Sequence, residues 1–230
     1  MPSDADLLAI ARDLAVEAGA LAVRRRREGV SVAATKSSPV DVVTETDREV
    51  EAFIRARLAE LRPDDGFFGE ESDAAESRSG LTWVVDPIDG TVNFLYDIPA
   101  WAVSIGVVEG GPDPATWTAV AGCVVNPVLG EVFTAARGQG AFLGDERIQV
   151  SGATDLALSL VGTGFAYSAE TRRIQAAVVT DLIGQTRDVR RIGSAALDLC
   201  SVAAGRLDAY YERGLSPWDH AAGALIAAEA

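Results

Sequence analysis

The most informative segment of the sequence is Trp83-Val84-Val85-Asp86-Pro87-Ile88-Asp89-Gly90-Thr91. The apolar run 82–85 is typical of a buried strand, and Asp86 follows directly at its end. Pro87 predicts that the chain turns there, and Asp89 comes three residues after Asp86. Gly90 and Thr91 then favour the start of a short helix, whose free N–H groups can hold a phosphate. The segment predicts two carboxylates beside an anion site, although an ordinary turn rich in Asp, Pro and Gly has the same composition.

Two further segments carry carboxylates whose positions suit a shared site. They are Gly69-Glu70-Glu71-Ser72 and Ser216-Pro217-Trp218-Asp219. Each acid could simply begin a helix. Carboxylates that converged without a counter-charge would repel by about 4 kcal/mol for each pair at about 4 Å, with an effective dielectric near 20. Divalent ions would convert that repulsion into binding, and ligand sets made of oxygen alone select magnesium, manganese or calcium.

The composition excludes several other functions. The net charge of −14, from 20 basic and 34 acidic residues, argues against nucleic acid and anionic membranes as partners. His220 is the only histidine, which argues against Ser-His-Asp triads, histidine-rich zinc sites and histidine proton relays. His220 itself is interpreted as a partly exposed helix residue. Cys123 and Cys200 stand far apart in the sequence and are expected to be buried thiols in a reducing cytoplasm.

The 230 residues, of which 48% are hydrophobic, can bury a substantial core. No apolar run reaches the roughly 20 residues of a membrane helix, and the N-terminus lacks the layout of a signal peptide. We therefore expect a cytoplasmic protein. The chain stops at Ala230 within a helical pattern, so we expect that the sequence is a fragment or that the natural tail is missing.

The apolar periodicity predicts a layered α/β protein in two parts, 1–150 and 151–230, that share one interface. In the first part it predicts helices over 4–28 and 46–61 and strands over 82–85, 101–108, 117–125, 131–135 and 141–142. In the second part it predicts strands over 158–163, 188–192 and 207–212 that alternate with helices over 169–185, 194–204 and 217–229. The segment 126–130 predicts a hairpin turn between two of the strands.

The chain resembles the inositol monophosphatase family over essentially its whole length. The matching segments are Lys36-Ser37-Ser38-Pro39-Val40-Asp41, Thr44-Glu45-Thr46-Asp47, Gly69-Glu70-Glu71-Ser72, Asp86-Pro87-Ile88-Asp89-Gly90-Thr91-Val92-Asn93-Phe94, Gly193-Ser194-Ala195-Ala196 and Trp218-Asp219. Their order and spacing are those of the family. The resemblance implies the αβαβα sandwich shared with fructose-1,6-bisphosphatases, and it implies a homodimer.

The resemblance also implies a set of metal ligands for two or three Mg²⁺ ions, with Mn²⁺ as a substitute. These ligands are Glu70, Asp86, the carbonyl oxygen of Ile88, Asp89 and Asp219, with Asp86 bridging two ions. Thr91, paired with Asp47, would help Glu70 to activate the attacking water. From spacing alone, Thr44-x-x-Asp47 predicts a helix capping box, so Asp47 is given both roles. Lys36 would lie near the site without a catalytic role.

The substrate contacts implied by the resemblance come from both parts of the chain. They are Asp89, Gly90, Thr91, Gly193, Ser194, Ala195 and Glu212. Gly90 and Thr91 would hold the phosphate through backbone N–H groups. Glu212 would reach the hydroxyls of an inositol ring, because a carboxylate accepts two such hydrogen bonds. An exposed glutamate at the end of a strand is the alternative for Glu212.

The implied activity is the Mg²⁺-dependent, lithium-sensitive hydrolysis of a small phosphate monoester, myo-inositol monophosphate above all. Activated water would attack phosphorus in line, without a phosphoenzyme. Histidinol phosphate is the first alternative substrate. A family phosphatase with another substrate, fructose bisphosphate or phosphoadenosine phosphate, is less favoured because no basic cluster for a second phosphate is evident. A regulatory or binding protein that keeps the fold without catalysis is an alternative of another class, but no predicted ligand is lost.

Overall fold

The computed structural model describes residues 2–35 and 42–230, so that the motif over 36–41, including Lys36, lies outside the described residues. The helices are α1 (Asp4–Glu28), α2 (Glu45–Leu61), α3 (Thr91–Leu95), α4 (Ala169–Ile183), α5 (Ala195–Ala203) and α6 (Pro217–Glu229). A single 3₁₀ turn, η1, spans Leu156–Leu158. The strands are β1 (Val32–Thr35), β2 (Val42–Thr44), β3 (Gly66–Gly69), β4 (Leu81–Asp89), β5 (Ala102–Glu109), β6 (Thr118–Asn126), β7 (Glu131–Ala136), β8 (Ala141–Leu143), β9 (Glu146–Ile148), β10 (Leu160–Thr163), β11 (Asp188–Arg190) and β12 (Ala209–Tyr211).

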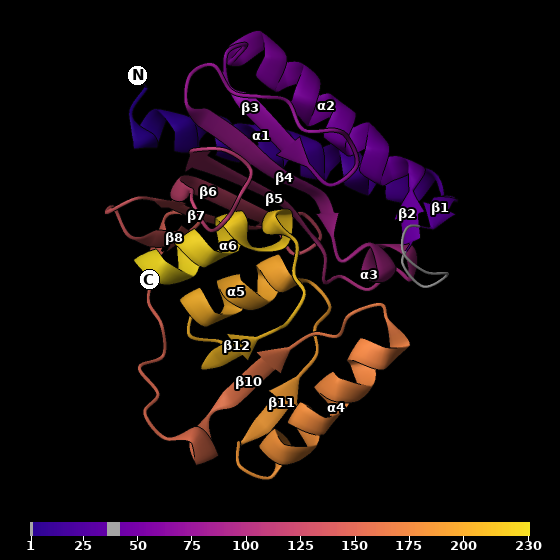
Figure 1. Ribbon diagram of the computed structural model, residues 1–230, viewed down its shortest axis with the longest axis vertical. Helices are drawn as coiled ribbons and strands as arrows, with labels where there is room; N and C mark the ends of the chain where they lie inside the picture. The colour runs from indigo at the N-terminus through magenta and orange to yellow at the C-terminus, as the bar shows by residue number, and fades with distance from the viewer. Residues whose placement is uncertain (1, 36–41) are drawn as a thin grey trace.

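The elements stack in five layers (Figure 1). Helices α1 and α2 cover one face of a seven-stranded sheet in the order β3-β4-β5-β6-β7-β8-β9. Helices α5 and α6 lie between that sheet and a second sheet of three parallel strands, in the order β11-β10-β12. Helix α4 forms the outer layer beside the smaller sheet. The predicted αβαβα sandwich is confirmed.

Strand β4 is the centre of the fold, since all nine of its residues are buried. It pairs in parallel with β3 and antiparallel with β5. The prediction that the strand ends before a turn at Pro87 was wrong. A register shift between Asp86 and Asp89 absorbs the proline, after which Asp89 pairs with Ala102 of β5. This irregularity bends the strand and directs both aspartates toward the same region.

Helix α1 packs on the large sheet through small side chains. Its N-terminus is closed by a capping box between Ser3 and Asp6, and three arginines lie in its last turn. Its buried face includes Leu7, Leu14 and several alanines, which allow the helix axis to approach the strands closely. Helix α2 begins at a second capping box, in which Asp47 accepts hydrogen bonds from the backbone N–H and hydroxyl of Thr44.

Helix α6 packs on the opposite face of the sheet over two glycines. Gly106 of β5 and Gly122 of β6 are paired across the strands. A Cβ atom at Gly106 would lie 2.9 Å from the Cβ of Ala221, and one at Gly122 would lie 3.0 Å from the Cα of Ala222. The missing side chains therefore let the helix backbone rest directly on the sheet, which sets the position of Asp219 in the first turn of α6.

Most predicted elements are confirmed, with shifted ends. The helices over 4–28 and 217–229 have the predicted bounds, and the hairpin at 126–130 joins β6 to β7. Helix α4 ends at Ile183, two residues before the predicted end. Strands β1, β2, β3 and β9 were not predicted.

Among residues 2–35 and 42–230, the helices do not combine the length and apolarity that crossing a membrane requires.

The glycine contact under α6 gives a first prediction. Gly122→Ala places a methyl group against the backbone of Ala222, which cannot move aside as a flexible side chain would. We expect a loss of about 1–3 kcal/mol in the free energy of unfolding, together with weaker divalent metal binding because Asp219 is displaced. Chemical denaturation and Mn²⁺ titration measure the two effects. Gly111→Ala is the matched control, since a Cβ there meets nothing within 4 Å; equal effects of both variants would contradict the prediction.

Candidate metal centre and active site

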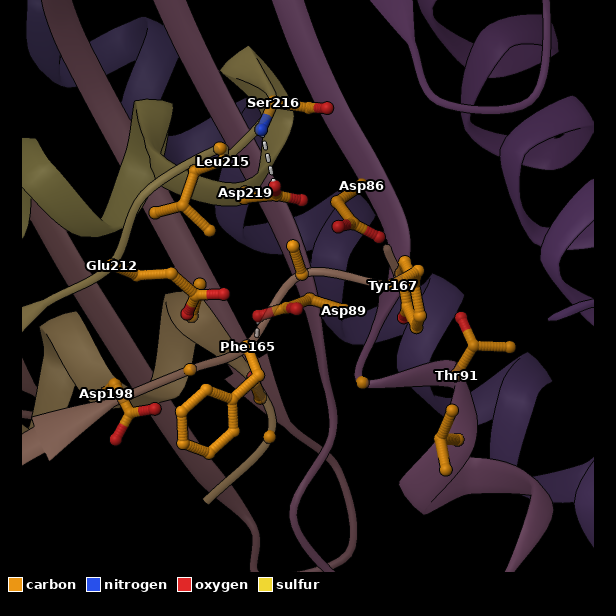
Figure 2. Close-up of a pocket in the computed structure, with 18 of the residues that line it drawn as sticks. Asp86, Asp89, Thr91, Phe165, Tyr167, Asp198, Glu212, Leu215, Ser216 and Asp219 are labelled. Carbon is orange, nitrogen blue, oxygen red and sulfur yellow. Dashed lines mark hydrogen bonds between the residues drawn. The ribbon is translucent and has the colours of Figure 1, made fainter. Parts of the chain in front are cut away.

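A cavity of about 600 Å³ opens where the layers meet. Its walls come from the end of β4, the start of α3, the loop after β10, and the starts of α5 and α6. Figure 2 shows Asp86, Asp89 and Asp219 at its centre, with Thr91 on one side and Glu212 on the other. Residues that stand more than a hundred positions apart in the chain therefore line one pocket.

Three carboxylates form the core of this site. One oxygen atom from each of Asp86, Asp89 and Asp219 lies within 4.8 Å of the other two. Asp86 has 1% of its surface exposed and Asp89 has 9%, so water screens their charges poorly. A set of converging hard oxygen ligands, buried and of one charge, fits a divalent cation of the magnesium type.

Each carboxylate is held by a backbone N–H group from its own surroundings. Asp86 Oδ1 accepts from the N–H of Ile88 at 3.0 Å, and Asp219 Oδ2 accepts from the N–H of Ser216 at 2.6 Å. Asp89 Oδ2 accepts from the hydroxyl of Ser194 at 2.6 Å and from the N–H of Ala196 at 2.7 Å. These bonds use one oxygen of each group. The carboxylates are thus oriented by the fold before any ligand binds.

The electrostatics of the cluster favour a bound cation. Burial, followed by the charges of Glu70, Asp89 and Asp219, raises the pKa of Asp86 well above its ordinary value. Burial raises the pKa of Asp89 to about 6, although the bonds from Ser194 and Ala196 oppose the shift. Burial and the charge of Asp89 raise the pKa of Asp219 to about 8. In the metal-free protein these groups therefore resist ionisation, and a divalent ion would relieve that resistance.

Glu70 reaches the pocket from the loop that follows β3, and a buried glutamate on α2 supports that loop. Glu70 is half-buried and lines the cavity. Glu51 has 2% of its surface exposed and accepts a hydrogen bond from the N–H of Glu71 at 2.8 Å. A Cβ atom at Gly69 would lie 2.4 Å from Glu51 Oε2, so the loop fits closely over this carboxyl group. Glu51 therefore positions the segment that carries Glu70.

Thr91 links the pocket to a buried acid behind it. Its hydroxyl lies 3.1 Å from Asp47 Oδ1 and 3.1 Å from the carbonyl oxygen of Ile88, and its proton can serve one acceptor at a time. Asp47 is fully buried, and burial raises its pKa to about 6 despite the hydrogen bonds from Thr44. Asp47 thus caps α2 and contacts Thr91, so the structure contains both of the contacts expected for it.

The turn into α3 requires glycine and contacts the second part of the chain. Gly90 has a φ of +96°, and a Cβ there would lie 3.1 Å from the carbonyl oxygens of Ala100 and Gly193. Asn93 donates from Nδ2 to the carbonyl oxygens of Ala100 at 2.6 Å and Ile192 at 3.0 Å. The beginning of α3 is thereby joined to the segment that precedes α5.

A second group of acids lies on the opposite side of the cavity from Thr91 (Figure 2). Glu212 Oε2 accepts a hydrogen bond from the hydroxyl of Tyr210 at 2.5 Å, and burial raises the pKa of Glu212. Asp198, on α5, has 1% of its surface exposed. Burial, with the charges of Asp89 and Glu212, raises the pKa of Asp198 to about 8.

The pocket brings together most of the residues expected at the site. Those that line it are Glu70, Asp86, Ile88, Asp89, Gly90, Thr91, Gly193, Ser194, Ala195, Glu212 and Asp219. Asp47 lies behind Thr91, and Lys36 lies outside the described residues. The roles of these residues as ligands or substrate contacts stay predictions.

Sequence reasoning missed two buried acids of the site, Glu51 and Asp198. Asp198 occupies an inward position of α5 whose other inward residues are apolar, a pattern that could have marked it as a buried acid. Ser194 was expected as a substrate contact, but its hydrogen bond to Asp89 was not expected, because its sequence signal resembles that of any N-cap serine.

The fold and the site together define a class of layered α/β proteins that gather acidic side chains in one pocket. Comparison with known proteins narrows this class. The sequence model of the inositol monophosphatase family matches residues 3–230. The chain belongs to the inositol monophosphatase family, which is a family of metal-dependent phosphatases.

Individual relatives agree with this assignment. The inositol-1-monophosphatase SuhB of Mycobacterium tuberculosis is 50% identical over 244 residues, covering 98% of this chain and 82% of that protein. The extragenic suppressor protein suhB of Bartonella henselae is 36% identical with a TM-score of 0.89, covering 98% of this chain and 85% of that one. SaIMPase-II, solved with inositol monophosphate bound, is 30% identical with a TM-score of 0.79, covering 97% and 79% respectively.

The support of the Glu70 loop gives a second prediction. Glu51→Ala removes the acceptor for the N–H of Glu71 and leaves a void under Gly69. We expect divalent metal affinity to fall by about ten- to a hundredfold, as for other losses of groups that orient metal ligands. Mn²⁺ titration calorimetry measures it. Glu49→Ala on the same helix is the matched control, because Glu49 pairs with Arg25 at the surface. Wild-type affinity in Glu51→Ala would rule out the positioning role.

The raised pKa values give a third prediction, which concerns stability. Asp89 and Asp219 have folded-state pKa values of about 6 and about 8 against an ordinary value of 3.8, so their protonated forms favour the folded state. The stability that they contribute is complete below the unfolded value and is lost as pH rises through the folded values. The Tm of metal-free protein should therefore fall between about pH 5 and about pH 8.

Mg²⁺ should reverse this loss, so its stabilising effect on Tm should grow over the same pH range. Thermal unfolding with EDTA or with Mg²⁺ at several pH values tests both statements. Asp219→Asn should show a smaller gain in Tm from Mg²⁺ than the wild type. A gain that is independent of pH and of residue 219 would contradict the assignment of these acids to a metal site.

Proposed function

We propose that this protein hydrolyses a small phosphate monoester in a Mg²⁺-dependent reaction, with myo-inositol monophosphate as its substrate. The observation that carries the proposal is the cluster of Asp86, Asp89 and Asp219 oxygens within 4.8 Å of one another at the base of an open cavity. A cluster of this charge can hold a phosphate only through cations. The family assignment supports the same reaction.

The proposed ligands are the carboxylates of the cluster, together with Glu70 and the carbonyl oxygen of Ile88. Bound Mg²⁺ would supply positive charge for the phosphate and lower the pKa of a water molecule. These residues would hold two ions, and Glu70 would take part in holding a third. The residues present fit this ligand set, because they offer converging oxygen ligands, and burial together with the charges of neighbouring acids raises the pKa of Asp86 and of Asp219.

Thr91 and Asp47 are proposed to handle the proton of the attacking water. The Thr91 hydroxyl can accept a hydrogen bond from that water while donating to Asp47 Oδ1. With a pKa of about 6, Asp47 is ionised at neutral pH and can take up the proton passed through Thr91. The water oxygen then bonds to phosphorus, the bond from phosphorus to the alcohol oxygen breaks, and that oxygen takes a proton from solvent.

The choice of substrate is inferred from the side of the pocket opposite Thr91. Glu212 is a half-buried carboxylate on the side of the cavity opposite Thr91, where the alcohol part of a substrate would lie. Carboxylates accept hydrogen bonds from the hydroxyls of a polyol. SaIMPase-II, a relative with the same fold, binds inositol monophosphate. Histidinol phosphate is the alternative, because an acidic wall could also accept its cationic groups.

Several finer properties belong to the same proposal and rest on family membership. They are inhibition by lithium, substitution of Mn²⁺ for Mg²⁺, a homodimer and a cytoplasmic location. A protein of this fold that binds partners without catalysis is the competing hypothesis from another class. It predicts no phosphate release under any metal condition.

The decisive experiment, and the fourth prediction, measures phosphate release with Mg²⁺ and with EDTA. Turnover of myo-inositol 1-phosphate should depend on Mg²⁺ and exceed that of histidinol phosphate. Asp86→Asn should lower turnover by a factor on the order of 10²–10³, because it removes the negative charge of a proposed metal ligand at the centre of the carboxylate cluster. The variant should stay folded, since it loses a carboxylate that its neighbours repel.

Each result has a defined meaning. Wild-type turnover in Asp86→Asn, with circular dichroism showing a native fold, would contradict the mechanism. Faster turnover of histidinol phosphate would overturn the substrate while leaving the mechanism in place. Absence of phosphate release from either compound would favour the competing hypothesis.

A further inference from the structure

Asp198 is a buried acid in the pocket that neither the metal cluster nor the proton relay uses. It lies in the first turn of α5 and has 1% of its surface exposed, yet it lines the cavity. Its Oδ1 atom is buried and has no hydrogen-bond partner among the described residues. Burying an unpaired oxygen of this kind costs free energy, so its retention at a cavity wall points to a ligand that completes it.

Two glycines make room for Asp198 and for Glu212. Gly162, in β10, and Gly164, just after that strand, are two residues apart and therefore face the same side. A Cβ at Gly162 would lie 3.2 Å from Asp198 Oδ1, and a Cβ at Gly164 would lie 1.8 Å from Glu212 Oε2. A side chain at position 164 would displace Glu212, and one at position 162 would press on Asp198. The end of β10 is thus shaped around two carboxyl groups.

These carboxyl groups have capacity to accept further hydrogen bonds. Tyr210 donates to Glu212 Oε2, which leaves Oε1 for a ligand. Burial, followed by the charges of Asp89 and Glu212, raises the pKa of Asp198. Arg191, which also lines the cavity, partly offsets their charge. Figure 2 shows both acids on the side of Asp89 away from Thr91.

We propose that Asp198 is a specificity-determining residue, which together with Glu212 forms a two-carboxyl subsite for neighbouring hydroxyl groups of the departing alcohol. This inference rests on the proposed function and deepens it, because it names the part of the substrate that the pocket selects. Hydroxyl groups on adjacent carbons present two donors to two separate acceptors. An alkyl phosphate without further hydroxyls leaves both acceptors unsatisfied and gains nothing from the subsite.

The fifth prediction compares three substrates at saturating Mg²⁺: myo-inositol 1-phosphate, n-propyl phosphate and histidinol phosphate. Asp198→Leu should lower kcat/KM for the inositol compound by about ten- to a hundredfold, mostly through KM, and Asp198→Asn should lower it less. The values for n-propyl phosphate should stay within about twofold in both variants. Asp181→Asn, at an exposed position of α4, is the control that should leave kcat/KM unchanged for all three substrates.

The Tm of each variant separates recognition from structure. Since Asp198 Oδ1 is unpaired, neither substitution should lower Tm. A fall in Tm with equal losses of kcat/KM on the inositol and propyl compounds would overturn the proposal. An unchanged ratio of kcat/KM between these two compounds in Asp198→Asn, the variant closest in shape to the wild type, would overturn it as well. A larger loss on histidinol phosphate than on the inositol compound would assign the subsite to cationic alcohols and overturn its assignment to polyols.

Failure of this inference is distinguishable from failure of the proposed function. If the wild type releases no phosphate from any of the three compounds with Mg²⁺, the proposed function itself is wrong. If the wild type hydrolyses them and the variants keep its substrate ratio, only the assignment of Asp198 is wrong.

Discussion

The structure is organised around a cluster of carboxylates that resist ionisation. Asp86 and Asp89 are buried and Asp219 is half-buried, and burial together with the charges of neighbouring acids raises the pKa of Asp86 and of Asp219. Left alone, such a cluster destabilises the fold. The cluster persists because the surrounding sheet and helices are stable enough to hold it. The stored repulsion is what would make a divalent ion bind strongly, so the instability and the proposed chemistry have one origin.

Elements from different layers of the fold position the three acids of this cluster. The bend in β4 brings Asp86 and Asp89 near each other, α5 fixes Asp89 through Ser194 and Ala196, and the glycines under α6 bring Asp219 to the site. The central strand is buried along its full length, which resists distortion by the charges that it carries. The acids are therefore placed by packing, and their electrostatics follow from that placement.

Much of this arrangement could be predicted from the sequence. Strong periodicity gave the bounds of α1 and α6, and the motifs named the acids that the pocket gathers, because both depend on local patterns. Strand β3 was missed since its two glycines have low strand propensity, and only its pairing with β4 makes it a strand. The continuation of β4 past Pro87 depends on a register shift against β5, and the unpaired state of Asp198 depends on its spatial neighbours. No local pattern contains that information.

The hold of α5 on Asp89 has a consequence for how the protein is made. Asp86 and Asp89 are synthesised more than a hundred residues before the residues that complete the site. Ser194 and Ala196 orient Asp89, and Asp219 is the third acid of the cluster. A nascent chain that has formed the large sheet still lacks the helices that cover its second face. The proposed ligand set therefore cannot be complete until residue 219 has left the ribosome, and metal binding by this set would be delayed until both halves have emerged.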